Sequence, residues 1–215
     1  MKKGFYLLFG FLLFWNGMQA QYYRNNDSGF LLRINADYTY PLGDFGKINK
    51  NGLGGNLSAK YLINRVIGIG LEAGYHSFKT DIAGNDNVAQ DYKCNLIPFV
   101  MEATFYIPTW DRTLLPYCGL HFGGYMTRIK INQQSNLYGD PAISKKLNLF
   151  SPGVGPDVGL LIELSEYVKL DLKIKGDYIL NIKDEYKIDE YTQGNIGFNK
   201  IMNLGFSVGL LYTFQ

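Results

Sequence analysis

Composition and charge exclude several classes of protein for this 215-residue chain. With 21 Lys and Arg against 19 Asp and Glu, the near-balanced charge gives no reason to expect a nucleic-acid partner. Beyond the N-terminus, polar residues interrupt every apolar stretch, so no segment suits a transmembrane helix and a membrane-spanning form must be a closed barrel.

Residues 1–20 have the features of a secretory signal peptide. Two lysines follow Met1, an apolar run comes next, and the segment ends at the small residue Ala20, after which we expect cleavage. A retained N-terminal anchor helix is the alternative. The remaining chain, residues 21–215, has the length of one domain, and without the two lysines its basic and acidic residues are equal in number.

Eight segments of residues 21–215 alternate apolar and polar side chains, which is typical of β-strands because successive residues of a strand point to opposite faces. The pattern is sharpest in residues 168–178, where a helical period would spread the lysines and aspartates around the whole circumference. Each segment has the roughly 9–11 residues that a tilted strand needs to cross a bilayer. The predicted strands are residues 30–40, 53–62, 67–78, 93–106, 117–129, 153–164, 168–178 and 203–214.

Two of these strands carry specific expectations. Pro98 has no backbone N–H to donate, which predicts a local break in the ladder of residues 93–106, with a bulge or a thin edge near the rim. In residues 117–129 the alternation is weak, and we assign each side chain by position. We expect Cys118, Leu120, Phe122 and Met126 outside the barrel, with Tyr117, His121 and Tyr125 inside.

The connections between the strands alternate in length. Three are short (residues 63–66, 108–114 and 165–167), and four are long, polar and rich in Gly, Asn and Asp (residues 41–51, 79–91, 132–151 and 181–199). Short turns at one end and long loops at the other are typical of outer-membrane barrels, in which the short turns lie in the periplasm. The sequence therefore predicts an all-β fold: an eight-stranded antiparallel up-and-down transmembrane β-barrel with four extracellular loops.

The end of the chain carries the most specific motif. Ser207, Gly209, Tyr212 and Phe214 form a pattern of polar residue, glycine, aromatic and terminal aromatic, followed by one extra residue. Together with the strands, this pattern resembles the small eight-stranded outer-membrane β-barrel family of Gram-negative bacteria, with its OmpA-like and OmpX-like barrels. The resemblance implies an outer-membrane protein in contact with lipid, whose last strand is recognised by the barrel-assembly machinery during insertion.

The same alternation also fits soluble eight-stranded carriers of lipocalin type, which turn the apolar face inward around a hydrophobic ligand. Aromatic residues at the strand ends and glycine-rich polar faces with both charge signs favour the membrane barrel. The bore of an eight-stranded barrel is just wide enough for side chains to fill it. Buried charges persist when they are paired, so we expect a plug of salt bridges, with a narrow ion path as the alternative. The predicted interior network is Arg33, Asp37, Lys60, Glu72, Glu102, Asp157, Glu163, Lys169, Asp171, Lys173, Lys175 and Asp177.

No residue pattern supports catalysis or a cofactor. His76 and Ser77 are adjacent, so a regular strand points them to opposite faces and prevents a nucleophile–base hydrogen bond. No zinc spacing, phosphate-binding loop or calcium loop occurs. Cys94 and Cys118 lie at different distances from the turn between their strands, which predicts two free thiols.

From these observations we expect a non-enzymatic outer-membrane protein, without cofactor or metal, that has a structural or surface-contact role through its four extracellular loops. One alternative is a narrow channel or a component of an envelope transport or secretion assembly. The other is a soluble exported carrier of a hydrophobic ligand.

Overall fold

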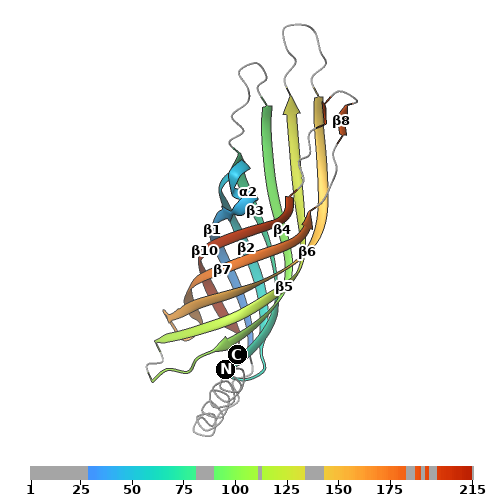
Figure 1. The fold of residues 1–215 in the computed structure, drawn as a ribbon. Coiled ribbons are helices and arrows are strands. Elements are labelled where there is room, and N and C mark those ends of the chain that lie inside the picture. The colour runs from blue at the N-terminus through green and yellow to red at the C-terminus, as the bar shows by residue number, and fades with distance from the viewer. Residues whose placement is uncertain are drawn as a thin grey trace, which may run out of the picture.

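The chain forms a closed barrel of eight antiparallel strands (Figure 1). Each strand pairs with the barrel strands before and after it in the chain, and the last one, β10, closes the barrel against the first, β1. The computed structural model describes residues 29–80, 90–110, 113–133, 143–182, 187–189, 192–193 and 198–214. The predicted signal peptide, residues 1–20, lies outside them. The barrel strands are β1 (Gly29–Leu42), β2 (Asn49–Leu62), β3 (Ile67–Thr80), β4 (Gln90–Tyr106), β5 (Leu114–Gln133), β6 (Ile143–Glu163), β7 (Val168–Ile182) and β10 (Phe198–Phe214). The predicted up-and-down barrel is confirmed.

The strands are strongly staggered around the barrel. Directly opposed residues, followed from Leu32 once around the wall, lead back to Leu42 on the same strand, ten residues further along (42 − 32 = 10). Such a stagger tilts the strands from the barrel axis, by about 35–45° in membrane barrels. At about 3.3 Å per residue, ten tilted residues rise roughly 25 Å, the height of the apolar band of a membrane barrel.

The alternation along each strand separates an apolar outer wall from a polar inner wall. Ile34 is 63% exposed and Leu53 is 64% exposed, whereas Arg33 and Ser58 are each 1% exposed. The ambiguous fifth strand follows the prediction, because Leu120 is exposed and its neighbours on the strand alternate as expected. A carrier of lipocalin type would have the opposite facing, so that alternative does not describe this barrel.

The short turns gather at one end of the barrel, and the strands lead into the long connections at the other (Figure 1). Short side chains fix two of these turns. The Asn64 side-chain oxygen accepts hydrogen bonds from the backbone N–H groups of Val66 (2.9 Å) and Ile67 (2.7 Å). The Ser165 hydroxyl accepts one from the N–H of Val168 (3.1 Å). Such local bonds favour a tight reversal, as expected for residues 63–66 and 165–167.

All eight strands run further at the loop end than predicted, and β4, β5 and β6 extend beyond the others. β4 begins at Gln90, β5 runs to Gln133, and β6 begins at Ile143, ten residues before the predicted start at 153. Paired residues continue from Met126↔Phe150 up to Gln133↔Ile143, so the three strands extend as a sheet beyond the rest of the barrel wall (Figure 1). The outer face of this part is polar, whereas Cys94, Leu96 and Ile129 on its inner face are buried. So short an alternation next to a polar connection is hard to distinguish from a loop in the sequence. We refer to the part above the row Ile97, Met126 and Phe150 as the β4–β6 extension.

A short helix, α2 (Gly43–Ile48), occupies the first long connection, where the sequence predicted a loop. Gly43 has φ of 61°, a left-handed conformation that glycine adopts without steric cost, and it turns the chain from β1 into the helix. Phe45 is 1% exposed and packs edge-on against Phe78, with ring centroids 5.2 Å apart. The helix therefore carries an aromatic side chain into the loop end of the barrel. No helix among the residues described is long and apolar enough to cross a membrane.

Two further details differ from or add to the prediction. Pairing of β3 with β4 omits the residues opposite Pro98 and Ile97, so the predicted local break in the ladder is confirmed. The register is the same on both sides of the break, so the predicted bulge is wrong. Pro98 also lies in the middle of β4 rather than near the rim. In the last long connection, β8 (Lys187–Asp189) and β9 (Thr192–Gln193) pair with each other.

Candidate functional site

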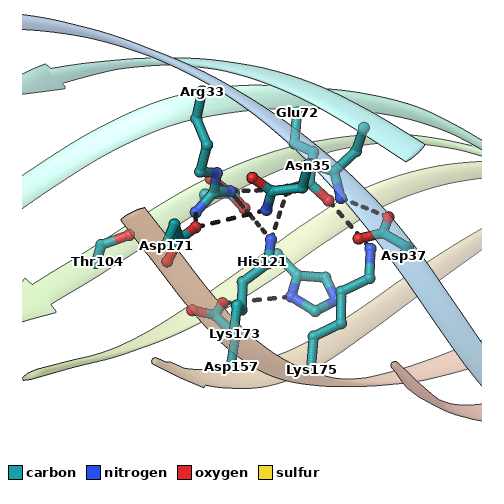
Figure 2. Close-up of polar contacts among 12 residues, drawn as sticks. Arg33, Asn35, Asp37, Glu72, Thr104, His121, Asp157, Asp171, Lys173 and Lys175 are labelled. Atoms are coloured by element: carbon teal, nitrogen blue, oxygen red, sulfur yellow. Dashed lines mark hydrogen bonds and ion pairs between the residues drawn. The ribbon is translucent and has the colours of Figure 1, made fainter. Parts of the chain in front are cut away.

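A layer of charged side chains fills the middle of the bore, with Arg33 at its centre (Figure 2). The Arg33 guanidinium donates to carboxylates on three other strands: Glu72 of β3 (2.8 Å), Glu102 of β4 (2.8 Å) and Asp171 of β7 (3.2 Å). Since β1 is separated from each of these strands by at least one other strand, the guanidinium ties together distant parts of the barrel wall. Charge-assisted hydrogen bonds of this kind are roughly twice as strong as neutral ones.

Three lysines complete this layer. The Lys60 ammonium lies 2.9 Å from Glu102 and donates to the Thr104 hydroxyl at 2.8 Å. Lys173 and Lys175, on one face of β7, donate to the two oxygens of Glu72 at 2.8 Å and 3.1 Å. Glu72 therefore accepts hydrogen bonds from three cations, and Glu102 also lies within 4 Å of three, since Lys173 is 3.6 Å from it.

The loop side of the layer contains both histidines. His121 Nε2 lies 3.0 Å from Asp177 and its Nδ1 lies 3.6 Å from Asp157, while the Tyr125 hydroxyl donates to Asp177 at 2.9 Å. His76 lies 3.7 Å from Asp37 and 3.2 Å from the Thr39 hydroxyl.

The charge balance of the layer depends on these histidines. Among the described residues, four cationic side chains (Arg33, Lys60, Lys173 and Lys175) and six carboxylates (Asp37, Glu72, Glu102, Asp157, Asp171 and Asp177) are buried. The two histidines lie against Asp37, Asp157 and Asp177, which form no salt bridge with a lysine or arginine among the described residues. Protonation of both rings would make the layer neutral.

Apolar side chains close the bore on both sides of the charged layer. At the turn end, Leu31, Tyr106, Tyr117, Leu161 and Leu211 form one buried cluster. At the loop end, a second cluster includes Phe45 of α2, Phe78, Leu96, Tyr125 and Ile179. The bore is thus occupied by three successive layers of side chains, which is the arrangement expected of an eight-stranded barrel whose interior is filled.

Glycine positions make room for the large rings in this interior. Tyr117 lies directly opposite Gly159, and a Cβ added to Gly159 would overlap the Tyr117 ring. With the ring across the glycine, the Tyr117 hydroxyl donates to Asp171 at 2.6 Å. Tyr117 therefore joins the apolar cluster to the charged layer.

The structure brings together ten of the twelve charged residues predicted for the interior. The two others lie outside the buried layer: Glu163 is exposed and Lys169 is half-buried. They oppose each other at the last paired positions of β6 and β7, next to the turn and outside the enclosed part of the bore. The sequence reasoning missed Asn35, Asn56 and Thr104 as members of the layer, although each occupies an inward position of a predicted strand.

The four residues of the terminal motif lie on β10 in two groups. Ser207 is buried. A Cβ at Gly209 would overlap the Asn35 side chain of β1, so only glycine fits at this position. Tyr212 and Phe214 face outward and contact each other, with ring centroids 4.7 Å apart. Recognition of this strand by the assembly machinery remains a prediction.

The remaining candidate groups are separated in space. His76 is buried in the bore and Ser77 is exposed on the outer face, as expected from the strand alternation. No group of three or more potential metal-binding side chains occurs in the described part of the chain. Cys94 is buried and Cys118 is exposed, and both thiols are free, which confirms the prediction.

Comparison with solved structures identifies the fold. The chain is similar to Neisserial surface protein A (TM-score 0.56, 19% identity, 86% of this chain and 97% of that one) and to a major outer membrane protein from Thermus thermophilus (0.52, 12%, 86% and 99%). It is also similar to Ail, the attachment invasion locus protein of Yersinia pestis, solved with the heparin analogue sucrose octasulfate (0.50, 15%, 88% and 100%). No protein-family model and no curated protein sequence matches the chain. The chain has the fold of the small eight-stranded outer-membrane β-barrels.

Proposed function

We propose that this protein is a non-enzymatic outer-membrane barrel with a closed bore, which anchors its loop end at the cell surface for contact with other molecules. The filled interior carries this proposal. A conducting pore needs a continuous path for water and ions, whereas here paired charges are enclosed between two apolar layers.

The outer surface supports the membrane location. Outward positions of every strand carry exposed apolar side chains, such as Leu57, Leu71 and Val208, which are 51%, 48% and 55% exposed. An uninterrupted apolar surface of this extent is unfavourable in water and favourable in hydrocarbon. Exposed aromatic residues, including Tyr40 and Tyr75 near the loop end and Tyr61 and Tyr212 near the turn end, have the distribution of interfacial girdles.

The loop end supports the surface-contact role. The strand ends that lead into the long connections and the β4–β6 extension all lie at that end (Figure 1). The Ail structure was solved with the heparin analogue sucrose octasulfate, and we propose that the loop end of this chain makes contacts with other molecules.

Two measurements test the proposal. We expect the protein without residues 1–20 to need detergent or lipid for solubility and to migrate differently on gels before and after heating. In planar bilayers we expect insertion without stepwise conductance. Reproducible conductance steps would favour the alternative of a narrow channel or transport component, and a folded protein in plain buffer would overturn the membrane location.

A further inference from the structure

The β4–β6 extension carries a group of cations on the outer face of the wall. Lys93 of β4 is directly opposite Lys130 of β5, which is directly opposite Lys146 of β6. One outward position below, Arg128 lies between Asn95 and Asn148. Directly opposed residues share one face of a sheet, so the four basic side chains form a single cluster. We name Lys93, Arg128, Lys130 and Lys146 the cationic patch.

The row of lysines costs energy in the isolated barrel. Directly opposed residues have Cβ atoms about 4.5–5.5 Å apart, and like charges at such positions are destabilising. Lys93 makes an additional interaction, so it is not counted among the cations without a salt bridge. Within the described residues, no carboxylate forms a salt bridge with Lys130 or Lys146, and Arg128 uses its Nε to donate to Asn148 at 3.0 Å. We therefore base the proposal on Arg128, Lys130 and Lys146. An external anion would remove their mutual repulsion.

The height of the patch identifies the kind of anion. Immediately below Arg128 lies the last apolar row of the outer wall, Ile97, Met126 and Phe150, of which Phe150 is 74% exposed. Two residues along a strand tilted by about 40° rise roughly 5 Å, so Arg128 lies about 5 Å and the lysine row about 10 Å above the apolar wall. The headgroup region of a bilayer adds about 5–8 Å on each side of the hydrocarbon core, so Arg128 lies within it. The lysine row lies just beyond its outer edge, from which the long lysine side chains can reach down to the headgroups.

We propose that the cationic patch binds the phosphate groups of lipid headgroups in the leaflet at the loop end of the barrel. This inference rests on the membrane location proposed above. The outward facing favours a lipid over a soluble phosphate, because a lipid whose chains lie on Met126 and Phe150 presents its headgroup at the level of the cations. Basic residues near an anionic membrane surface each contribute about 1 kcal/mol, or about fivefold in affinity.

The test uses the purified protein in detergent and three probes: diphosphorylated lipid A, its dephosphorylated form, and inorganic phosphate. Native mass spectrometry counts the lipid retained as the lipid concentration is raised. We expect the wild type to bind the diphosphorylated lipid, and the triple variant Arg128→Gln/Lys130→Gln/Lys146→Gln to bind it roughly a hundredfold more weakly. A control with the same charge change at scattered sites of the loop end, Lys47→Gln/Lys50→Gln/Lys200→Gln, should bind it within about threefold of the wild type.

Three outcomes would overturn the inference. These are unchanged binding by the triple variant, an equal loss in the scattered control, or equal retention of the dephosphorylated lipid. Displacement of lipid A by an equal concentration of inorganic phosphate would assign the patch to a free anion instead. Heat-modifiable migration and insertion into vesicles are measured on the same samples. Failure of the wild type to insert refutes the membrane location, whereas insertion without selective binding refutes only the lipid site.

Discussion

Replacing Glu72 by alanine should destabilise the barrel strongly, because it removes the carboxylate that three buried cations share. Arg33, Lys173 and Lys175 lie 2.8, 2.8 and 3.1 Å from the Glu72 oxygens. After the substitution, Arg33 keeps two other carboxylates and Lys173 keeps Glu102 at 3.6 Å. Lys175 has no other salt bridge among the described residues, so its buried ammonium loses its direct partner.

The expected loss in the free energy of unfolding follows from Lys175, the lysine left without a salt bridge. Breaking a buried ion pair by removing one partner costs about 3–5 kcal/mol, because the remaining charge stays buried without compensation. We expect Glu72→Ala to lower the free energy of unfolding by about 4 kcal/mol. Adding Lys175→Met removes the orphaned charge while keeping an apolar chain of similar length, and we expect it to restore roughly half of the loss.

The assay is equilibrium unfolding by urea in detergent micelles, with the folded fraction read from the gel band that migrates ahead of the heated protein. Glu163→Ala is the matched control, because Glu163 is an exposed carboxylate on the same barrel and should change the free energy of unfolding by less than about 0.5 kcal/mol. A loss below about 1 kcal/mol for Glu72→Ala, or no recovery in the double variant, would refute the assignment of Glu72 as the shared partner.

Three further predictions concern the wall and the apolar layers. Leu172→Lys places a charge on the lipid face and should lower the free energy of unfolding in urea by about 2–4 kcal/mol, whereas Leu172→Ile should leave it nearly unchanged. Phe45→Ala should lower the free energy of unfolding by about 3 kcal/mol. In a Cys118→Ser background it should also make the buried Cys94 of the same cluster react with a maleimide. An unreactive thiol would show that Phe45 does not cover this layer. Gly159→Ala should displace the Tyr117 ring and lower the urea midpoint, and an unchanged midpoint would show that the ring moves without cost.

The strand alternation made the wall predictable. In β7, Lys173 and Lys175 cannot face lipid without a large cost, so the facing of the whole strand follows from two residues. The same rule placed His121 and Tyr125 inside on β5, although the apolar pattern of that strand is weak. Because inward charges must be paired, the composition of the bore followed as well.

The apolar layers of the bore were not predictable in the same way. Leu31 and Leu211 occupy inward positions near the turn end, but in the sequence an inward leucine is indistinguishable from an irregularity in the pattern. Phe45 reaches the loop-end cluster only because Gly43 turns the chain back over the barrel, and a six-residue helix leaves no periodic signal. Partners within the charged layer depend on which strands face each other across the bore, which neither alternation nor spacing determines.

The charged layer supplies a constraint on register that the alternation lacks. A slip of one residue between neighbouring strands would turn Lys173 and Lys175 toward lipid, so the alternation already excludes it. A slip of two residues keeps every side chain on its own face, and the apolar wall would tolerate it. It would, however, move the Lys175 ammonium by roughly 6–7 Å relative to Glu72, which would break a 3.1 Å contact and leave both charges buried and unpaired. Since Arg33 contacts carboxylates on β3, β4 and β7, a two-residue slip of any of these strands relative to β1 breaks at least one of its bonds. The network therefore favours the native strand register over two-residue slips, which would leave the apolar outer wall unchanged.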